Sequence, residues 1–474
     1  MLKAEYTKGN IAVIMLKTAA AMLASTLAMS GYNIADTFFV GLLGEKPLAA
    51  MGFTFPIIML AGCIFAGFGS GCMAIMAQAI GQGDTRTANR IVTSGMLLLA
   101  IISGIIGGCG ILFADPLFTL LGAEGETLRN LKEYMNVWFA GCMTAGIAMK
   151  GNNLLIAAGR PRLASMLTIA GMLINVVLDP IFILGGRGIH EVVCASGYDS
   201  SFISTIISWF YFIPAQGIRG AAAATLISQA VSAVTLLTVL CRVGLLSFKP
   251  IPPASLFSSW KRIAGYAIPS ILGMVLMPVT SAVTTWVTGQ FGDTLVAAVA
   301  AASRLEMVAF VLPMAFGIPL MSIIAQNYGA RLYSRVRYAF YFSSITAFCV
   351  LAVSSAVLYF GIDRISVFFT DVPEIRVLMG RYMRIIVWGF GLLELSRYSG
   401  FVLTGTGHPR LDAVLKAVRM VCLLIPFSLL AYALKWQDGV FAARLAADVI
   451  GGGICLFTAW HILRRLPAED GVES

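Results

Sequence analysis

The sequence predicts an all-helical integral membrane protein built from two copies of one six-helix unit. A mean hydropathy of +0.87, with 58% apolar and 12% charged residues, excludes an ordinary soluble domain. Apolar runs long enough to cross a bilayer recur along the whole chain. Two long stretches also repeat each other 248 positions apart. These features together indicate a duplicated membrane bundle.

The repeat pairs residues 41–81 with residues 289–329 without a gap, and about a third of the paired positions are identical. The same offset carries the Gly-x-Pro-Arg-Leu segment at 159–163 onto the one at 407–411. Chance similarity between apolar segments would not keep one register over this distance. Internal duplication is typical of secondary transporters, so the repeat predicts function as well as fold.

Twelve spans are expected, six in each half. They are 11–40, 48–80, 91–114, 134–158, 163–185, 217–241, 263–290, 294–328, 336–361, 382–404, 411–434 and 439–462. The predicted domains are an amino-terminal lobe over 1–246, a cytoplasmic linker over 247–262 and a carboxy-terminal lobe over 263–474.

The charge distribution predicts the orientation in the membrane. The formal net charge is +10, and the basic residues gather at the amino terminus and in every second loop, while the alternate loops hold most of the acids. The positive-inside rule therefore places both termini in the cytoplasm, as an even number of spans requires. The sequence contains no HExxH, G-x-S-x-G or P-loop motif and no metal-spaced His/Cys cluster, so a membrane-embedded enzyme is disfavoured and no cofactor is expected.

Acidic side chains deep in two spans are the strongest functional signal. Asp36 lies in the first span and Asp179 in the fifth, and a charge inside a bilayer costs about 2.5–3.5 kcal/mol on insertion scales. Tyr32 precedes Asp36 by one helical turn, and Asn175 precedes Asp179 by the same interval, so each pair shares a helix face. Asn152 in the fourth span and Thr225 in the sixth add further oxygen atoms.

This mixture of oxygens suits two kinds of coupling ion. Carboxylate, amide and hydroxyl oxygens can coordinate Na⁺, a hard cation. Alternatively, two neighbouring carboxylates can take up and release a proton. A structural alternative is that Asp36 caps a helix end and Asp179 starts a turn at Pro180. The second-half counterparts of Asp36, Asn175 and Asp179 are Thr284, Leu423 and Phe427, so the acids belong to one half only.

Two further charged positions are ambiguous. Glu394 and Arg397 in the tenth span are three residues apart and can pair with each other, so a buried structural ion pair and a substrate contact are both open. Lys150 in the fourth span lies about two turns from a cytoplasmic loop and is expected to snorkel toward it.

Several segments resemble the multidrug and toxic compound extrusion (MATE) transporters. They are AMLASTLAMSGYNIADTFFVGLLGEKPLAAMGF, AAGRPR and INVVLDPIFILG. The resemblance covers nearly the whole chain and implies two six-helix lobes that alternate between inward-open and outward-open states. It also implies export of organic cations and other amphipathic compounds in exchange for Na⁺ or H⁺.

The acids resemble the DinF-like branch of that family, whose ion site lies in the amino-terminal lobe. The residues that match this site are Asp36, Asn175, Asp179 and Thr225, with Tyr32 and Asn152 as neighbours. The NorM-like branch has a glutamate in the seventh span, and no glutamate lies near Met277 here. One departure is Ala21, where the DinF-like branch usually has a proline, which puts bending of the first helix at that point in doubt.

The function predicted from the sequence is therefore a cation-coupled antiporter of the bacterial inner membrane, a monomer that exports amphipathic drugs. A lipid-linked saccharide flippase of the same superfamily is the alternative. Flippases favour basic residues in the cavity to hold a pyrophosphate, whereas the deep unpaired charges here are mainly acidic, which favours cationic cargo. Nucleic acid is not expected as a partner.

Overall fold

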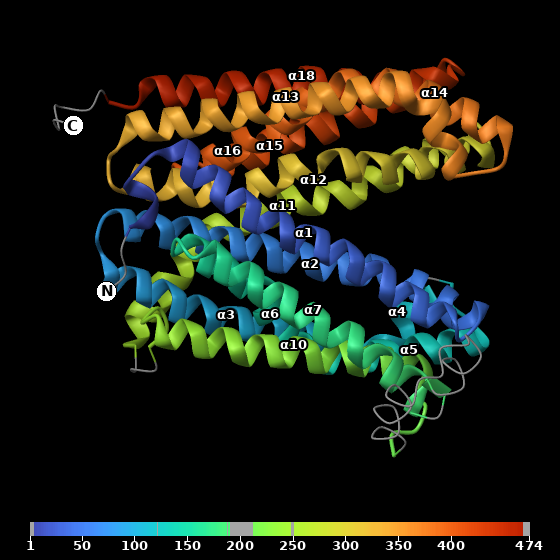
Figure 1. Ribbon diagram of the computed structural model, residues 1–474, viewed down its shortest axis with the longest axis horizontal. Helices are drawn as coiled ribbons and strands as arrows, with labels where there is room; N and C mark the ends of the chain where they lie inside the picture. Colours follow the sequence, from blue (N-terminus) through green and yellow to red (C-terminus); the bar gives the residue numbers. More distant parts are fainter. Residues whose placement is uncertain (1–3, 121, 187, 190–211, 248–250, 468–474) are drawn as a thin grey trace, which may run out of the picture.

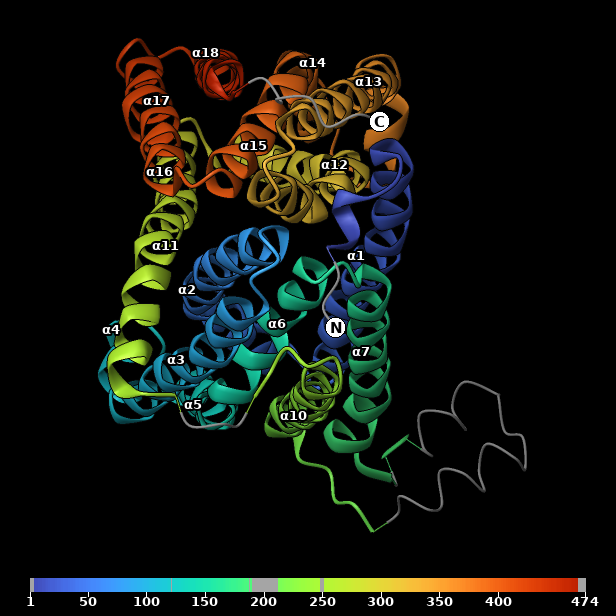
Figure 2. The ribbon, with the colours of Figure 1, turned by 90° about the vertical axis from the view of Figure 1, so that its left-hand side faces the viewer.

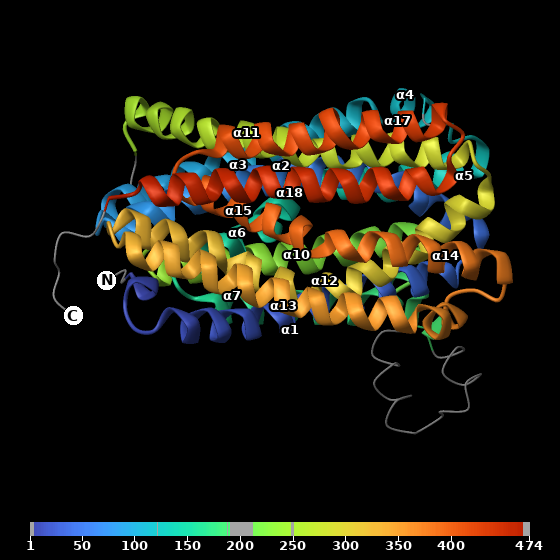
Figure 3. The same cartoon turned by 90° about the horizontal axis from the view of Figure 1, so that it is seen from above.

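The computed structural model describes residues 4–120, 122–186, 188–189, 212–247 and 251–467, and long helices run along the long axis of the molecule (Figures 1 and 3). The first half contains α1 (Ile11–Gly41), α2 (Glu45–Gly81), α3 (Thr85–Leu112), α4 (Ala114–Leu120), α5 (Gly125–Ala140), α6 (Cys142–Ala157), α7 (Pro161–Ile183) and α10 (Gly217–Arg242). The second half contains α11 (Pro253–Gly289), α12 (Asp293–Gly329), α13 (Tyr333–Ile365), α14 (Pro373–Ile386), α15 (Phe390–Gly405), α16 (Pro409–Ala417), α17 (Ile425–Ala433) and α18 (Gln437–Arg465).

Ten helical segments of the described chain are long and apolar enough to cross a membrane. The other two predicted spans, 134–158 and 382–404, are each interrupted. Gly141 separates α5 from α6, and a 3₁₀ turn over Val387–Gly389 separates α14 from α15. Backbone hydrogen bonds from 141 to 137 and from 145 to 141 continue through the first interruption, so α5 and α6 form one kinked span. The twelve-helix prediction is confirmed.

Gly141 and Gly389 are equivalent positions of the repeat, and both allow close packing. A Cβ atom at Gly141 would lie 2.0 Å from the Leu226 side chain on α10, and one at Gly389 would lie 3.0 Å from Leu445 on α18. In each half, therefore, the fourth span bends where it presses against the last helix. The repeat conserves this bend as well as the helices.

Two helices flank the seam between the halves. Viewed from the end of the molecule that carries both termini, the helices after α11 group together, those between α1 and α11 form a second group, and α1 and α11 lie at opposite sides (Figure 2). α1 packs on α7 of its own half and on α12 of the other, while α11 packs on α2 and α3 as well as on α16. α11 begins at Pro253, inside the range predicted as a linker. The lobe boundaries themselves stay a prediction.

The first helix is unbroken from Ile11 to Gly41 and contains no proline. At Ala21, where a proline was expected from the resemblance, the carbonyl oxygen accepts a hydrogen bond of 2.6 Å from the Ser165 hydroxyl on α7. α1 is therefore tied to α7 at this point.

A reciprocal pair of hydrogen bonds joins the halves near the end that carries the termini. The Gln78 Nε2 donates to the Gly405 carbonyl at 2.8 Å, and the Gln326 Nε2 donates to the Ala157 carbonyl at 2.6 Å. Gln78 and Gln326 are equivalent positions of the repeat, and so are Ala157 and Gly405. One contact is thus made twice, about an approximate twofold axis. Both glutamine side chains are buried.

Two equivalent glycines let the helices approach closely enough for these bonds. A Cβ atom at Gly81 would lie 2.0 Å from the Gln326 carbonyl oxygen, and one at Gly329 would lie 2.1 Å from the Gln78 carbonyl oxygen. Only glycine permits that distance between two backbones. We call these two glycines, the two glutamines and their carbonyl partners at 157 and 405 the glutamine latch.

The segment before α1 seals the same end. The Tyr6 backbone N–H donates to the Gln326 Oε1 at 3.1 Å, and the Tyr6 hydroxyl donates to the Ile156 carbonyl at 2.9 Å. Tyr6, Ile11 and Met15 belong to one buried apolar cluster with side chains of the second half. This end of the molecule is therefore closed by packing and hydrogen bonds from both halves.

We expect Gly81→Ala to destabilise this closed state, because the new methyl group must displace backbone rather than a flexible side chain. The loss should be about 1–3 kcal/mol, the usual cost of overpacking. Thermal unfolding in detergent measures it. Gly52→Ala is the matched control on the same helix, since a Cβ atom there meets nothing within 4 Å. Equal unfolding midpoints for the two variants would contradict the close approach at the latch.

Candidate functional site

The predicted coupling residues meet inside the first half because α7 packs against both α1 and α10. The residues concerned are Tyr32 and Asp36 on α1, Asn152 on α6, Asn175 and Asp179 on α7, and Thr225 on α10. The apolar composition of these helices keeps them in the bundle, so their few polar side chains have only each other as partners.

Asn175 connects the buried members of the site. Its Nδ2 donates to the Asp179 Oδ1 at 3.2 Å and lies 3.4 Å from the Thr225 Oγ1. The three residues are 1%, 0% and 5% exposed, respectively. The one-turn spacing of Asn175 and Asp179 on α7 therefore does place both on the same inward face, and Thr225 completes the group from α10.

The α1 residues approach from the opposite side. Tyr32 makes a side-chain hydrogen bond with Thr225, and Asp36 lies close enough to Asp179 for the two carboxylates to repel each other. Asp36 is half-buried, whereas Asp179 is fully buried. The pair thus combines one part-exposed aspartate with one fully buried aspartate.

Four buried oxygen atoms of the predicted coupling residues lack a hydrogen-bond partner in the described part of the chain. They are the Asp36 Oδ1, the Asn152 Oδ1, the Asn175 Oδ1 and the Asp179 Oδ2. A buried polar atom without a partner costs about 1–3 kcal/mol, so a cluster of them is rare unless it serves a ligand. All four oxygen atoms are hydrogen-bond acceptors, so a bound cation or proton would stabilise them.

The alternative role as helix caps does not fit the geometry. Asp36 lies five residues inside the end of α1, where the last carbonyls are capped by the Leu42 backbone N–H instead. Asp179 likewise lies inside α7, which continues past Pro180 to Ile183. Neither carboxylate occupies a helix terminus.

Asn152 on α6 bonds α7 seven residues before Asn175, about 10 Å away along that helix, and no hydrogen bond joins it to the other predicted site residues in the described chain. Its Nδ2 donates to the Thr168 Oγ1 on α7 at 3.0 Å, and that hydroxyl in turn donates to the Ala164 carbonyl at 3.0 Å. These two bonds orient the Asn152 amide and leave its oxygen free to accept.

The sequence analysis missed Tyr134 on α5. This side chain is 4% exposed and interacts electrostatically with Tyr32, Asp36 and Asp179. The available signal was a tyrosine at the start of a predicted span, which is too common in membrane proteins to single out one residue.

The charged residues of the second half form ion pairs. Glu394 is fully buried and its Oε2 lies 3.0 Å from the Arg397 guanidinium, which also stacks over the Phe310 ring at 5.6 Å. A larger network joins α12, α14 and α18: the Glu306 carboxylate binds Arg444 and the Tyr382 hydroxyl. In the same network the Asp448 carboxylate accepts a bond of 2.6 Å from Arg419 and lies 3.8 Å from Arg444.

The buried acids of the two halves therefore have different surroundings. In the second half each buried acid has a cation beside it, whereas in the first half Asp36 and Asp179 have none among the described residues. Paired charges hold helices together, while unpaired acids are available to a ligand. No group of three or more His, Cys, Asp or Glu side chains in the described chain is arranged to hold a metal ion.

The MatE family model matches the chain twice, over residues 21–181 and 269–430. The chain belongs to the MatE family. The two matches lie 248 residues apart at their starts, in agreement with the repeat read from the sequence. It is a multi-pass membrane transporter and not an enzyme.

Curated relatives cover almost the entire chain. A protein of Shewanella oneidensis named FAD transporter is 27% identical over 96% of this chain and 96% of its own length. The multidrug export protein MepA of Staphylococcus haemolyticus is 22% identical over 98% of this chain and 96% of its own length.

Solved structures agree in fold. A mutant of the Vibrio cholerae MATE transporter VcmN has a TM-score of 0.84 at 23% identity and covers 96% of this chain and 97% of its own. A MOP superfamily transporter from Pyrococcus furiosus, described as having a binding pocket of reverse polarity, has a TM-score of 0.84 at 21% identity, with 98% of this chain and 99% of its own covered.

Substitution of an acid that binds a ligand should change the stability of the protein less than substitution of an acid in a stabilising ion pair. We expect Asp179→Asn to leave the unfolding midpoint unchanged or to raise it, because it removes a buried charge that has no cation. Glu306→Gln should lower the free energy of unfolding by about 3 kcal/mol, because it removes the closer of the two acids that neutralise the part-buried Arg444. Thermal unfolding of both purified variants checks this. A larger loss in Asp179→Asn would assign that carboxylate a structural role.

Proposed function

We propose that this transporter is an antiporter that exports amphipathic compounds and takes up H⁺ or Na⁺ at Asp36, Asp179, Asn175 and Thr225. The single observation that carries the proposal is that buried acceptor oxygens of the neighbouring Asp36, Asn175 and Asp179 lack hydrogen-bond partners among the described residues. A proton or a Na⁺ ion would satisfy them at low cost, so the occupied and empty states differ in free energy. Such a difference is what couples a gradient to a change of shape.

The two carboxylates have separate parts in this proposal. Asp36 is half-buried and receives the ion, while Asp179 is fully buried and holds it with the Asn175 and Thr225 oxygens. Tyr32 and Asn152 line the same space. Glu394 and Arg397 are proposed to contact the cargo from the second half, because the Arg397 side chain remains 34% exposed although it pairs with Glu394.

Alternating access follows from the closed end. With the glutamine latch shut, the cargo space communicates only with the opposite side. Release of the latch and closure of the far end would present the same space to the other side. The lobes 1–246 and 263–474 are proposed to be the moving bodies, with 247–262 joining them.

Two classes of cargo are supported by the relatives. The unpaired carboxylates favour organic cations, and the MepA relatives are named multidrug exporters. The Shewanella relative named FAD transporter favours a second candidate, a flavin nucleotide. A lipid-linked saccharide flippase remains the alternative outside drug export.

The location is proposed from charge and relatedness. The bacterial relatives favour the inner membrane. Basic residues near both termini and in the loops on that side favour cytoplasmic termini, which would make the state described here open to the outside. A monomer is proposed, because each chain contains both halves of the bundle.

We expect ethidium efflux from cells expressing the intact chain, and at least a tenfold lower rate for Asp36→Asn and for Asp179→Asn. Each variant removes a charge that the coupling ion must neutralise. Imposed Na⁺ and pH gradients, applied separately in everted vesicles, identify the ion. Thr284→Val, at the second-half counterpart of Asp36, is the matched control and should transport normally. Normal efflux by both carboxylate variants would contradict the proposed site.

A further inference from the structure

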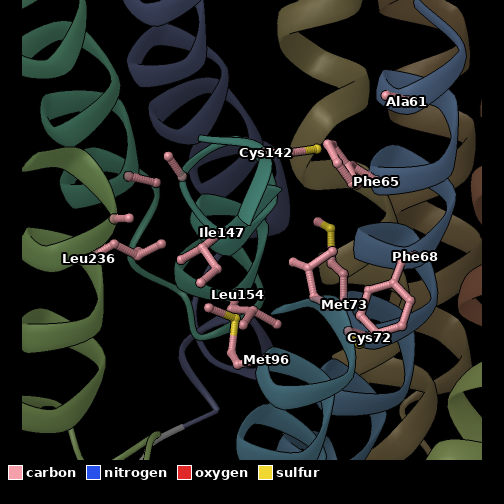
Figure 4. Close-up of a cluster of buried hydrophobic side chains, with 14 of the residues drawn as sticks. Ala61, Phe65, Phe68, Cys72, Met73, Met96, Cys142, Ile147, Leu154 and Leu236 are labelled. Carbon is pink, nitrogen blue, oxygen red and sulfur yellow. The ribbon is translucent and has the colours of Figure 1, made fainter. Parts of the chain in front are cut away.

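Lys150 lies on α6 within the apolar interior of the first half. Ile147 and Leu154, one turn to either side of it, are buried, and Figure 4 shows them in the packed cluster with Phe65 and Phe68 of α2. A charged lysine in a membrane span costs free energy, and no ion pair of Lys150 offsets that cost in the described chain.

The lysine has no counter-charge. None of the described residues forms an ion pair with its ammonium or accepts a hydrogen bond from it, whereas each buried acid of the second half has a cation beside it. The snorkelling expected from the sequence stays a prediction. The Lys150 stem packs on Gly69, with its Cβ and Cδ atoms 3.1 and 3.3 Å from the position of a Cβ there.

The side chain packs on α2, close to the second half. The Lys150 ammonium is near enough to the Cys63 thiol for the two groups to interact, and Cys63 lies six residues before Gly69 on α2, farther from the latch. That thiol in turn lies 3.7 Å from the Met274 carbonyl on α11, across the seam. Lys150 therefore contacts the helix that forms part of the interface that alternating access would open.

Lys150 is also close to the latch along its own helix. It precedes Ala157, whose carbonyl is a latch acceptor, by seven residues, or about 10 Å of α-helix. Asn153, one turn after Lys150, faces Gly69 as well, with its Nδ2 3.1 Å from the Cβ position there. The Lys150 stem and the Asn153 amide thus pack against the same glycine, just inside the closed end.

We propose that Lys150, assisted by Asn153, binds an anionic group of the cargo, a phosphate or a carboxylate. The inference rests on the proposed export function and adds a substrate class to it: amphipathic molecules that carry an acid at one end. Gly69 leaves room for the two side chains themselves, because any larger residue would press on the lysine stem and the Asn153 amide. A bound anion would supply the missing counter-charge and would be released when the helices around the seam separate.

Matched probe pairs test this by binding to the purified transporter, without any gradient. Riboflavin and riboflavin 5′-phosphate differ by one phosphate, and rhodamine 6G and its free acid differ by one carboxylate. For at least one pair, we expect the intact chain to bind the anionic member about tenfold more tightly, as one charge-assisted contact allows. Lys150→Gln should abolish that preference, and Lys150→Arg should largely keep it.

Equal affinities within both pairs for the intact chain would overturn the proposal. So would a Lys150→Gln variant that keeps its preference, or one that loses the uncharged and anionic members equally, since that result would assign Lys150 a packing role. Lys150→Met provides a second neutral variant of similar length in case Lys150→Gln does not fold. The probe pair whose relative affinity depends on Lys150 shows whether the site binds a phosphate or a carboxylate.

The coupling proposal is judged separately. Asp36→Asn and Asp179→Asn remove transport of every cargo if it is right, whereas the Lys150 variants alter the choice among cargoes. Binding that depends on Lys150 in a protein that fails to respond to ion gradients would uphold the anion site and reject the coupling site.

Discussion

The glutamine latch is the contact on which the rest of the structure depends. Gln78 and Gln326 each bond a carbonyl of the other half, and Gly81 and Gly329 bring the two backbones together. Side-chain amides inside a membrane protein must find partners, so the closed arrangement is specific. The bonds number only two, however, and each contributes about 1 kcal/mol, so the closed end can open.

The helices of the two halves are arranged symmetrically, whereas their buried charged residues differ. The repeat places bends at Gly141 and Gly389 and latch residues at equivalent positions. The buried charges differ: the second half pairs Glu306 with Arg444, whereas in the first half Asp36 and Asp179 have no cation beside them among the described residues. In the proposed mechanism, a duplicated frame would thus let one half serve as a support and the other carry the ion.

Much of this was predictable from the sequence. Hydropathy predicts the helices, and the repeat between positions 248 residues apart predicts the two halves, because both are patterns along the chain. The one-turn spacing of Asn175 and Asp179 correctly placed them on one face. Three features depend on packing between distant segments and were not predictable: the contribution of Tyr134, the packing of the Lys150 stem on Gly69 and the reciprocal latch bonds.

The distance across the glutamine latch during transport tests most directly whether the latch opens and closes as a gate. Gln82 and Ala330 follow α2 and α12 and are equivalent positions of the repeat, so spin labels there, in a cysteine-free chain, report on opening. Pulsed electron resonance in nanodiscs should find a short and a long distance, with populations that change with pH or Na⁺ and stop changing in Asp179→Asn. A single short distance under every condition would contradict the latch as a gate.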